Sequence, residues 1–320
     1  MRRHLWSVVL FCLMSHALAQ QPKEVTLRLR YAPGQTLLYD IGLDGKVTVI
    51  SEIGVATDLQ FQGKLKQEQQ VEEVADDGTA TLLVTVNGMV QVSMGGNPAP
   101  GTPASQQSNE MTIPATKWRL KIAPNGRIVE MKPVTAEKAS DGKEKITPQP
   151  FLQDPFQALT LGAGAMSLLP AILPDKPVKV GDSWDLTANA PLPMGGGRIL
   201  VALKGSGKLL ALQQEDNRPV AITEMRLEVP ELGGAIVKAM PLKEMGIDMQ
   251  AKGGTKTVGK HWLDLSQGLL MRSEVTTETQ MFTLIRMPEN AGGGVMSLQS
   301  RTTIKTTMRL VEVRAVTSRQ

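Results

Sequence analysis

The feature that most constrains this fold is a two-residue alternation of apolar and polar side chains that recurs along the chain. At the start, Val25, Leu27, Leu29 and Tyr31 alternate with polar residues, the pattern of a strand with one buried face. The same pattern predicts strands at 36–51, 56–74, 79–94, 113–123, 127–134, 198–213, 218–229, 246–265 with a break at Gly253-Gly254, 269–287 and 295–314. Several are longer than usual. They favour a mainly β fold of long, curled antiparallel strands.

Two glycine-containing turns predict hairpins with defined registers. For Asn125-Gly126 the predicted pairs are Ile122 with Val129, Leu120 with Met131, Trp118 with Pro133 and Lys121 with Glu130. For Ser266-Gln267-Gly268 they are Leu265 with Leu269, Leu263 with Met271 and Lys260 with Glu274. Gly268 would take the left-handed conformation of that turn.

A third glycine pair, Asn87-Gly88, does not fit a hairpin. Folding back there would mix polar and apolar side chains on one face, whereas reading straight through keeps every second residue apolar. We therefore predict one continuous strand at 79–94, with Gly88 as a bend or bulge.

The first 19 residues read as a cleaved export signal. Arg2 and Arg3 precede an apolar run, and Ala17-Leu18-Ala19 forms a cleavage site before Gln20. The apolar run is about half of the roughly 20 residues that cross a bilayer. We therefore expect a periplasmic or extracellular protein that does not span the membrane.

The remaining chain is predicted to hold two related β units. The predicted parts are a first unit at 20–134, a linker at 135–150, a helical segment of one or two short helices at 151–174, and a second unit at 175–320. The second unit includes another turn or two of helix at 235–245. Landmarks such as Gly34, Gly63 and Trp118 recur at near-constant spacing as Gly181, Gly207 and Trp262, which favours an internal duplication. Whether the two units share one sheet stays open at this stage.

Composition excludes most catalytic chemistry. The only cysteine, Cys12, and two of the three histidines, His4 and His16, lie in the signal, so disulfides, thiolates and histidine metal clusters are not expected. His261 is then the single base, and it is interpreted as a surface or edge residue of its hairpin. The acidic pair Asp76-Asp77 precedes Gly78 and is interpreted as part of a turn. Asp182 and Asp185 flank Trp184 at the start of a strand and are not interpreted as a catalytic pair. We predict a protein that is not an enzyme and uses no cofactor.

Charge and aromatic content bear on partners. Lys and Arg alternate with Asp and Glu, and the formal net charge is only +4 before Arg2 and Arg3 are removed. Aromatic residues make up 3% of the chain, too few for stacking platforms. Nucleic-acid binding is not expected.

Methionine is the one positive anomaly, with 17 residues in the whole chain. Flexible thioethers either fill gaps in a core or line surfaces that adapt to apolar ligands. We name Met271 and Met281 as candidate ligand-lining residues. Charging either one would abolish ligand uptake in a binding groove and would unfold a solid core.

Three motifs carry a family resemblance. They are the hairpin Trp262–Ser273, the segment Gly181-Asp182-Ser183-Trp184 and the strand start Asp77-Gly78-Thr79-Ala80-Thr81. Together they resemble uncharacterised bacterial exported β-sheet proteins and, more distantly, the curled-sheet lipoprotein carriers. That resemblance implies a half-barrel in which helices close an apolar cavity.

Two functions follow from these observations. The first is binding of a lipid or other apolar small molecule in a concave groove of the sheet. The alternative is a structural or protein-interaction module of the cell envelope, with an envelope protein as partner and no small-molecule ligand.

Overall fold

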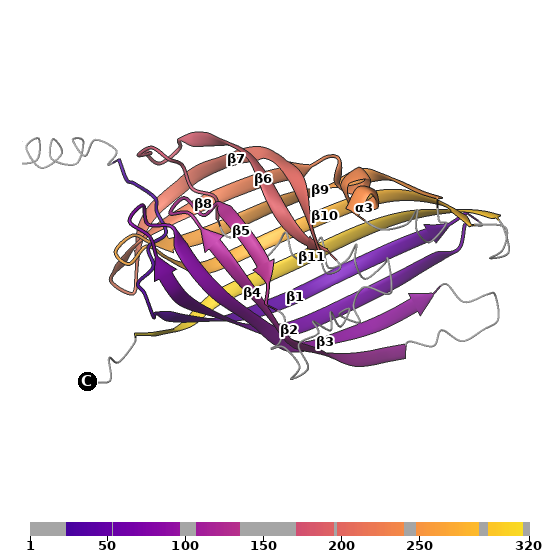
Figure 1. The fold of residues 1–320 in the computed structure, drawn as a ribbon, viewed down its shortest axis with the longest axis horizontal. Coiled ribbons are helices and arrows are strands. Elements are labelled where there is room, and N and C mark those ends of the chain that lie inside the picture. Colours follow the sequence, from indigo (N-terminus) through magenta and orange to yellow (C-terminus); the bar gives the residue numbers. More distant parts are fainter. Residues whose placement is uncertain are drawn as a thin grey trace, which may run out of the picture.

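In the computed structural model, antiparallel strands form one strongly curled sheet (Figure 1). The structure describes residues 24–52, 54–96, 107–134, 171–194, 197–239, 248–287 and 294–315. The strands are β1 (Thr36–Ser51), β2 (Ala56–Val74), β3 (Ala80–Gly96), β4 (Gln107–Ile122), β5 (Ile128–Pro133), β6 (Ser183–Met194), β7 (Gly197–Glu215), β8 (Arg218–Val229), β9 (Asp248–Asp264), β10 (Leu269–Met287) and β11 (Gly294–Arg314). Within these ranges the only helix is α3 (Leu232–Ala239).

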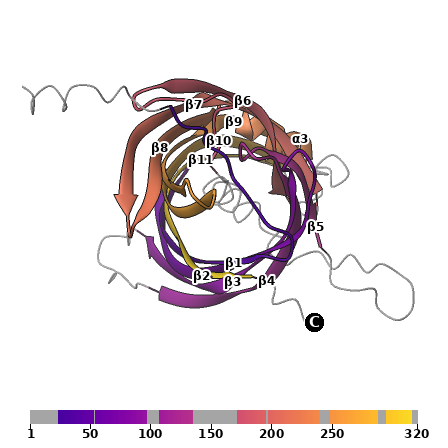
Figure 2. The ribbon, with the colours of Figure 1, turned by 90° about the vertical axis from the view of Figure 1, so that its left-hand side faces the viewer.

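The 11 strands lie in the order β5-β4-β3-β2-β1-β11-β10-β9-β8-β7-β6. Strands that are consecutive in the chain therefore pair with each other, except β5 and β6, which form the two edges of the sheet. In addition, the first strand, β1, pairs with the last, β11. The sheet curls until its edge strands β5 and β6 touch, although they form no ladder (Figure 2). The mainly β prediction is confirmed, and the strands of the two predicted units share a single sheet. The duplication and the unit boundaries stay predictions.

The alternation of side chains separates an inner from an outer face. In β1, Leu37, Ile41 and Val47 are at most 2% exposed and point inward, while Asp40 and Lys46 are exposed on the outside. Each such buried aliphatic side chain contributes about 1.5–3 kcal/mol. A slip of one residue would turn every side chain to the other face, so burial fixes the register.

Most predicted strands are confirmed to within a few residues, because long alternating runs specify them strongly. The continuous strand through Asn87-Gly88 is also confirmed as β3. Its register against β4 shifts between Val86 and Gly88, and Gly88 has a φ of 153°. A side chain at Gly88 would meet the carbonyl oxygen of Lys64 at 2.3 Å.

The β4–β5 hairpin matches its prediction except next to the turn. Trp118, Leu120 and Lys121 have the predicted partners, but Ile122 pairs with Ile128. The predicted pairing of Ile122 with Val129 is wrong. Val129 is left out of the ladder and is 64% exposed, because the turn at Gly126 closes with an extra residue on the β5 side.

The β9–β10 hairpin shows a similar correction. Lys260 pairs with Glu274 as predicted, and Gly268 has a φ of 71°. However, Leu269 faces Asp264 and Leu270 faces Leu263, so the predicted pairs of Leu265 with Leu269 and Leu263 with Met271 are wrong.

The cause lies in the turn itself. The Asp264 carboxylate accepts hydrogen bonds from the backbone N–H groups of Ser266 and Gln267 at 2.8 and 3.0 Å. The Leu265 N–H donates to Pro219 at 2.8 Å, so Leu265 leaves the ladder. The residue gained on the β10 side is Met271, which becomes a bulge.

Three further expectations are corrected. Strand β6 was not predicted, because its Ala-Pro-Leu-Pro run interrupts the alternation. Strand β9 runs without a break through Gly253-Gly254, where any side chain would clash with backbone carbonyl groups of neighbouring segments. Residues 25–31 are extended but form only an isolated bridge between Val25 and Val178.

Residues 24–31 instead run as a strap across one end of the curled sheet (Figure 2). The Leu29 N–H donates to Pro124 in the β4–β5 turn at 2.7 Å, and the Arg30 N–H donates to Gly268 in the β9–β10 turn at 2.9 Å. Leu27 and Leu29 are 0% and 3% exposed, within a cluster formed with β3, β4, β7, β8 and β9. The alternation predicted the side-chain burial of this segment correctly, although the segment packs across the sheet and does not join it.

Several predictions fall outside the described residues. These are the export signal at 1–19, the linker at 135–150 and nearly all of the helical segment at 151–174. Of that segment, Ala171–Leu173 is described and buried. The helix predicted at 235–245 begins earlier, at Leu232, and its described part ends at Ala239. In the part of the chain that is described, no helix has the length and apolar character needed to cross a membrane.

Candidate functional site

The inner face of the sheet is an uncharged surface. In β1, β8, β9, β10 and β11, no described inward position carries Asp, Glu, Lys or Arg. Three buried apolar clusters cover much of this face. One lies beneath α3, one surrounds the strap, and one joins β1–β3 to β10 and β11. An ionised ligand group would find no opposite charge on these strands.

A band of hydroxyl groups crosses this face. Thr255, Thr279 and Thr302 face one another across β9, β10 and β11, and each is at most 6% exposed. The Thr255 and Thr279 hydroxyls lie 2.6 Å apart, and Thr255 also donates to the Glu278 carbonyl at 3.0 Å. In the next row, the Thr257 and Thr277 hydroxyls are 3.2 Å apart. The hydroxyl groups within each of these two pairs therefore meet their hydrogen-bonding requirement with each other.

His261 lies in the same band and is 1% exposed. Its Nδ1 is 3.0 Å from the Ser273 hydroxyl on β10. Burial lowers the pKa of the His261 imidazole to about 4 from an ordinary value of 6.5, because desolvation disfavours the cation. At neutral pH the ring is therefore uncharged.

Two polar atoms near this point are buried without any hydrogen-bond partner among the atoms of the structure: His261 Nε2 and Thr306 Oγ1. The imidazole leans over Gly259, where an added Cβ would lie 2.9 Å from Nε2. Gly259 pairs with Val275, and Val275 pairs with Thr306, so both atoms border one cross-strand row. An unpaired buried polar group costs about 1–3 kcal/mol. A ligand atom that reached either of these atoms would recover that free energy.

The end of the sheet opposite the strap exposes apolar side chains of the inner face. Met94 pairs with Leu59, which pairs with buried Val47, and Met94 is 53% exposed. Across the sheet, Met296 pairs with Ile285 and is 42% exposed. The helix α3 packs on the inner face of β7, β9 and β10 near this end.

The two methionines named from the sequence are on opposite faces, so the structure does not bring them together. Met281 points inward, is 3% exposed and packs beneath α3, where an added Cβ at Gly233 would lie 2.9 Å from its Cε. Met271, at the β10 bulge, is half-buried and borders a groove on the outer side. Their roles as ligand-lining residues stay predictions.

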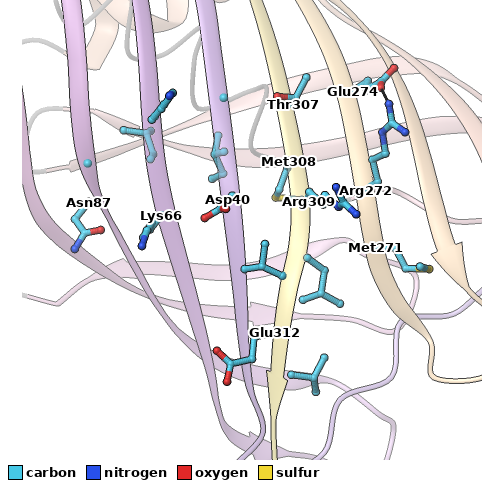
Figure 3. Close-up of a pocket in the computed structure, with 18 of the residues that line it drawn as sticks. Asp40, Lys66, Asn87, Met271, Arg272, Glu274, Thr307, Met308, Arg309 and Glu312 are labelled. Carbon is cyan, nitrogen blue, oxygen red and sulfur yellow. Dashed lines mark hydrogen bonds and ion pairs between the residues drawn. The ribbon is translucent and has the colours of Figure 1, made fainter.

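That outer groove has a volume of about 1500 Å³ and crosses β3, β2, β1, β11 and β10 (Figure 3). Asn87, Lys66, Asp40, Arg309 and Arg272 stand opposite one another in one row across these strands. Both signs of charge are interspersed here, so the groove suits polar contacts better than an apolar ligand.

Of the acidic pairs considered in the sequence, Asp76-Asp77 lies in a turn, as interpreted there, whereas Asp182 directly precedes β6 and Asp185 lies within it. Asp77 accepts a hydrogen bond from the Thr79 N–H at 2.8 Å, which lowers the pKa of the Asp77 carboxyl. Asp182 accepts one from the Lys179 N–H, also at 2.8 Å. Within the described ranges, no group of three or more His, Cys, Asp or Glu residues could hold a metal ion.

Comparisons with known proteins add little to this picture. No protein-family model matches the sequence, and no curated protein matches it. Among solved structures, the crystal structure of Pseudomonas aeruginosa OccK7 (OpdD) matches with a TM-score of 0.25 and 12% identity, over 88% of this chain and 99% of that chain. A TM-score this low supports no inference. The comparisons do not show the resemblance to lipoprotein carriers.

Sequence reasoning placed Met94 on the apolar face of its strand but missed Ser273 and Thr306 as members of the inner face. A usable pattern was present for part of the band: Thr255 and Thr257 precede Gly259 and His261 at every second position. Polar residues at inward positions of a strand mark a place where the inner surface changes character. The pairing across β10 and β11 that adds Ser273 and Thr306 needed the strand order.

Proposed function

We propose that this protein is an exported, non-enzymatic binding protein that takes an elongated apolar ligand against the inner face of its curled sheet. The observation that carries the proposal is the difference between the two ends of the sheet. At one end the strap buries Leu27 and Leu29, and at the other Met94 and Met296 are exposed on the inner face.

The chemistry of the inner face supports this choice of ligand. Exposed apolar side chains that continue into an apolar interior are typical of ligand-binding grooves. Methionines suit such a surface because their side chains adapt to differently shaped apolar groups. The absence of charge at the described inward positions of β1 and β8–β11 favours an uncharged ligand. Export to the periplasm or the medium rests on the predicted signal at 1–19.

A matched pair of variants on β3 tests the proposal. Met94 and Met89 are each 53% exposed, but Met94 belongs to the inner face and Met89 borders the outer groove. We expect Met94→Glu to weaken uptake of the apolar fluorophore N-phenylnaphthylamine about tenfold or more, because the ligand would have to pass a charged side chain. Met89→Glu should leave uptake unchanged.

Stability measurements complete this experiment. Both side chains are exposed, so each variant should unfold within about 0.5 kcal/mol of the parent protein. Equal effects of the two variants on uptake would contradict an inner-face site. Loss of uptake in Met89→Glu alone would place the binding surface on the outside.

The outer groove supports the second candidate, an envelope interaction module. Its mixed charges, including Lys66, Asp40 and Arg309, fit the polar surface of a protein partner. A photocrosslinking residue at Met89 would then capture an envelope protein in cells, and one at Met94 would not. Absence of any crosslink at Met89 would contradict this alternative.

A further inference from the structure

We infer that His261 and Thr306 form a polar anchor for an uncharged head group with at least two polar atoms, so that the preferred ligand is a glyceride-like lipid. This inference rests on the proposed function, because it concerns the same inner face. It adds the chemical class of the ligand. The inference is carried by the two inner-face atoms that are buried without a hydrogen-bond partner among the described residues, His261 Nε2 and Thr306 Oγ1.

The first step concerns what each atom can accept or donate. Ser273 already engages Nδ1 of His261, so only Nε2 of the ring is free for a ligand. Depending on the tautomer, Nε2 either donates or accepts one hydrogen bond, and the Thr306 hydroxyl can do both. A hydroxyl group on the ligand suits every one of these combinations, since it also both donates and accepts.

The second step concerns charge. A fatty acid at neutral pH would bring a carboxylate to a face whose described inward positions in β1 and β8–β11 carry no Lys or Arg. The buried imidazole is uncharged there and offers no cation. An unpaired carboxylate would lose its hydration without compensation, whereas an uncharged hydroxyl or ester would not.

The third step concerns distance. Gly259, over which Nε2 lies, and Thr306 are separated by one intervening strand, β10. Two strand spacings correspond to roughly 9–10 Å. This is the separation of the two backbones, and a glycerol ester, with several oxygens along a short backbone, can bridge it and contact both atoms.

Thr306→Val is the most informative variant. It removes the hydroxyl and keeps the shape of the side chain, and the lost hydroxyl has no hydrogen-bond partner among the described residues. Stability should therefore stay equal or rise, so a change in binding cannot be attributed to misfolding. Thr303→Val on the same strand is the matched control, because Thr303 is at an outward position.

The experiment measures displacement of N-phenylnaphthylamine from the full mature chain by monooleoylglycerol, oleate and hexadecane at neutral pH. We expect monooleoylglycerol to compete about tenfold better than hexadecane or oleate, because it gains two hydrogen bonds and brings no charge. In Thr306→Val its affinity should fall about three- to tenfold, while that of hexadecane stays unchanged. Thr303→Val should behave as the parent.

The outcomes separate this inference from the proposed function. Uptake of the fluorophore with no preference for monooleoylglycerol, or an equal effect of Thr306→Val on all competitors, would overturn the anchor alone. A preference for oleate would also overturn it, because it would require a cation at the site. No uptake of any probe would overturn the proposed function and the anchor together.

Discussion

The buried, uncharged imidazole of His261 makes the stability of the protein depend on pH in a defined way. Its pKa is about 4 in the folded chain, against an ordinary value of 6.5. Because the folded value is the lower one, the unfolded chain binds a proton in this interval and the folded chain does not. The contribution of the neutral His261 to the free energy of unfolding is therefore fully present above the unfolded pKa. It declines as the pH falls from there toward the folded pKa.

The size of the effect follows from the same two values. One pKa unit corresponds to about 1.4 kcal/mol, so the full difference is on the order of 3 kcal/mol. Between about pH 7.5 and pH 5, where the unfolded histidine is mostly protonated, the expected loss is about 2 kcal/mol. That is a large share of the 5–15 kcal/mol by which domains are typically stable.

Urea unfolding of the mature chain at these two pH values measures this loss. The comparison is His261→Phe, which keeps a planar ring and cannot titrate. His261 is the only histidine beyond the predicted signal. The difference between the two proteins in the free energy of unfolding lost between the two pH values therefore reports on this one side chain. Equal loss of stability in both proteins would contradict a buried neutral imidazole, as would an NMR titration of the ring near its ordinary pKa.

Two further predictions concern the strap. Leu27→Ala should lower the free energy of unfolding by about 3–5 kcal/mol, because the Leu27 side chain of the strap is fully buried against the sheet. Arg28→Ala, at the exposed neighbouring position, should change the free energy of unfolding by about 0.5 kcal/mol or less. Equal unfolding midpoints for the two variants would mean that the strap does not pack as described. Gly268→Ala should cost about 1–3 kcal/mol in the same assay, because Gly268 has a φ of 71° and an added Cβ would lie 2.6 Å from Cγ of Arg30, and a neutral result would argue against the left-handed turn.

The sequence alone predicts the strands well because the alternating burial of side chains is a local property. Strands β1, β2, β8 and β10 have the predicted bounds. It fails where a distant contact decides the local structure. Residues 25–31 have the pattern of a strand, yet they hydrogen-bond to two turns far away in the chain. The position of Met271 depends on the Asp264 carboxylate, which reshapes the adjacent turn.

The candidate site was harder to predict for the same reason. His261 was interpreted as a surface or edge residue of its hairpin, but the structure buries it. Its unpartnered nitrogen can be recognised as part of a site only once the pairing of β9, β10 and β11 shows that Ser273 and Thr306 lie nearby. Strand order sets these neighbours, and no local pattern in the sequence encodes it.

Native mass spectrometry of the mature protein, purified without detergent from the exported fraction, tests the central claim most directly. We predict a fraction of the protein with an added mass that organic solvent removes, and an extract that contains an uncharged lipid. A bare polypeptide mass, together with no uptake of N-phenylnaphthylamine by the same sample, would contradict binding at the inner face.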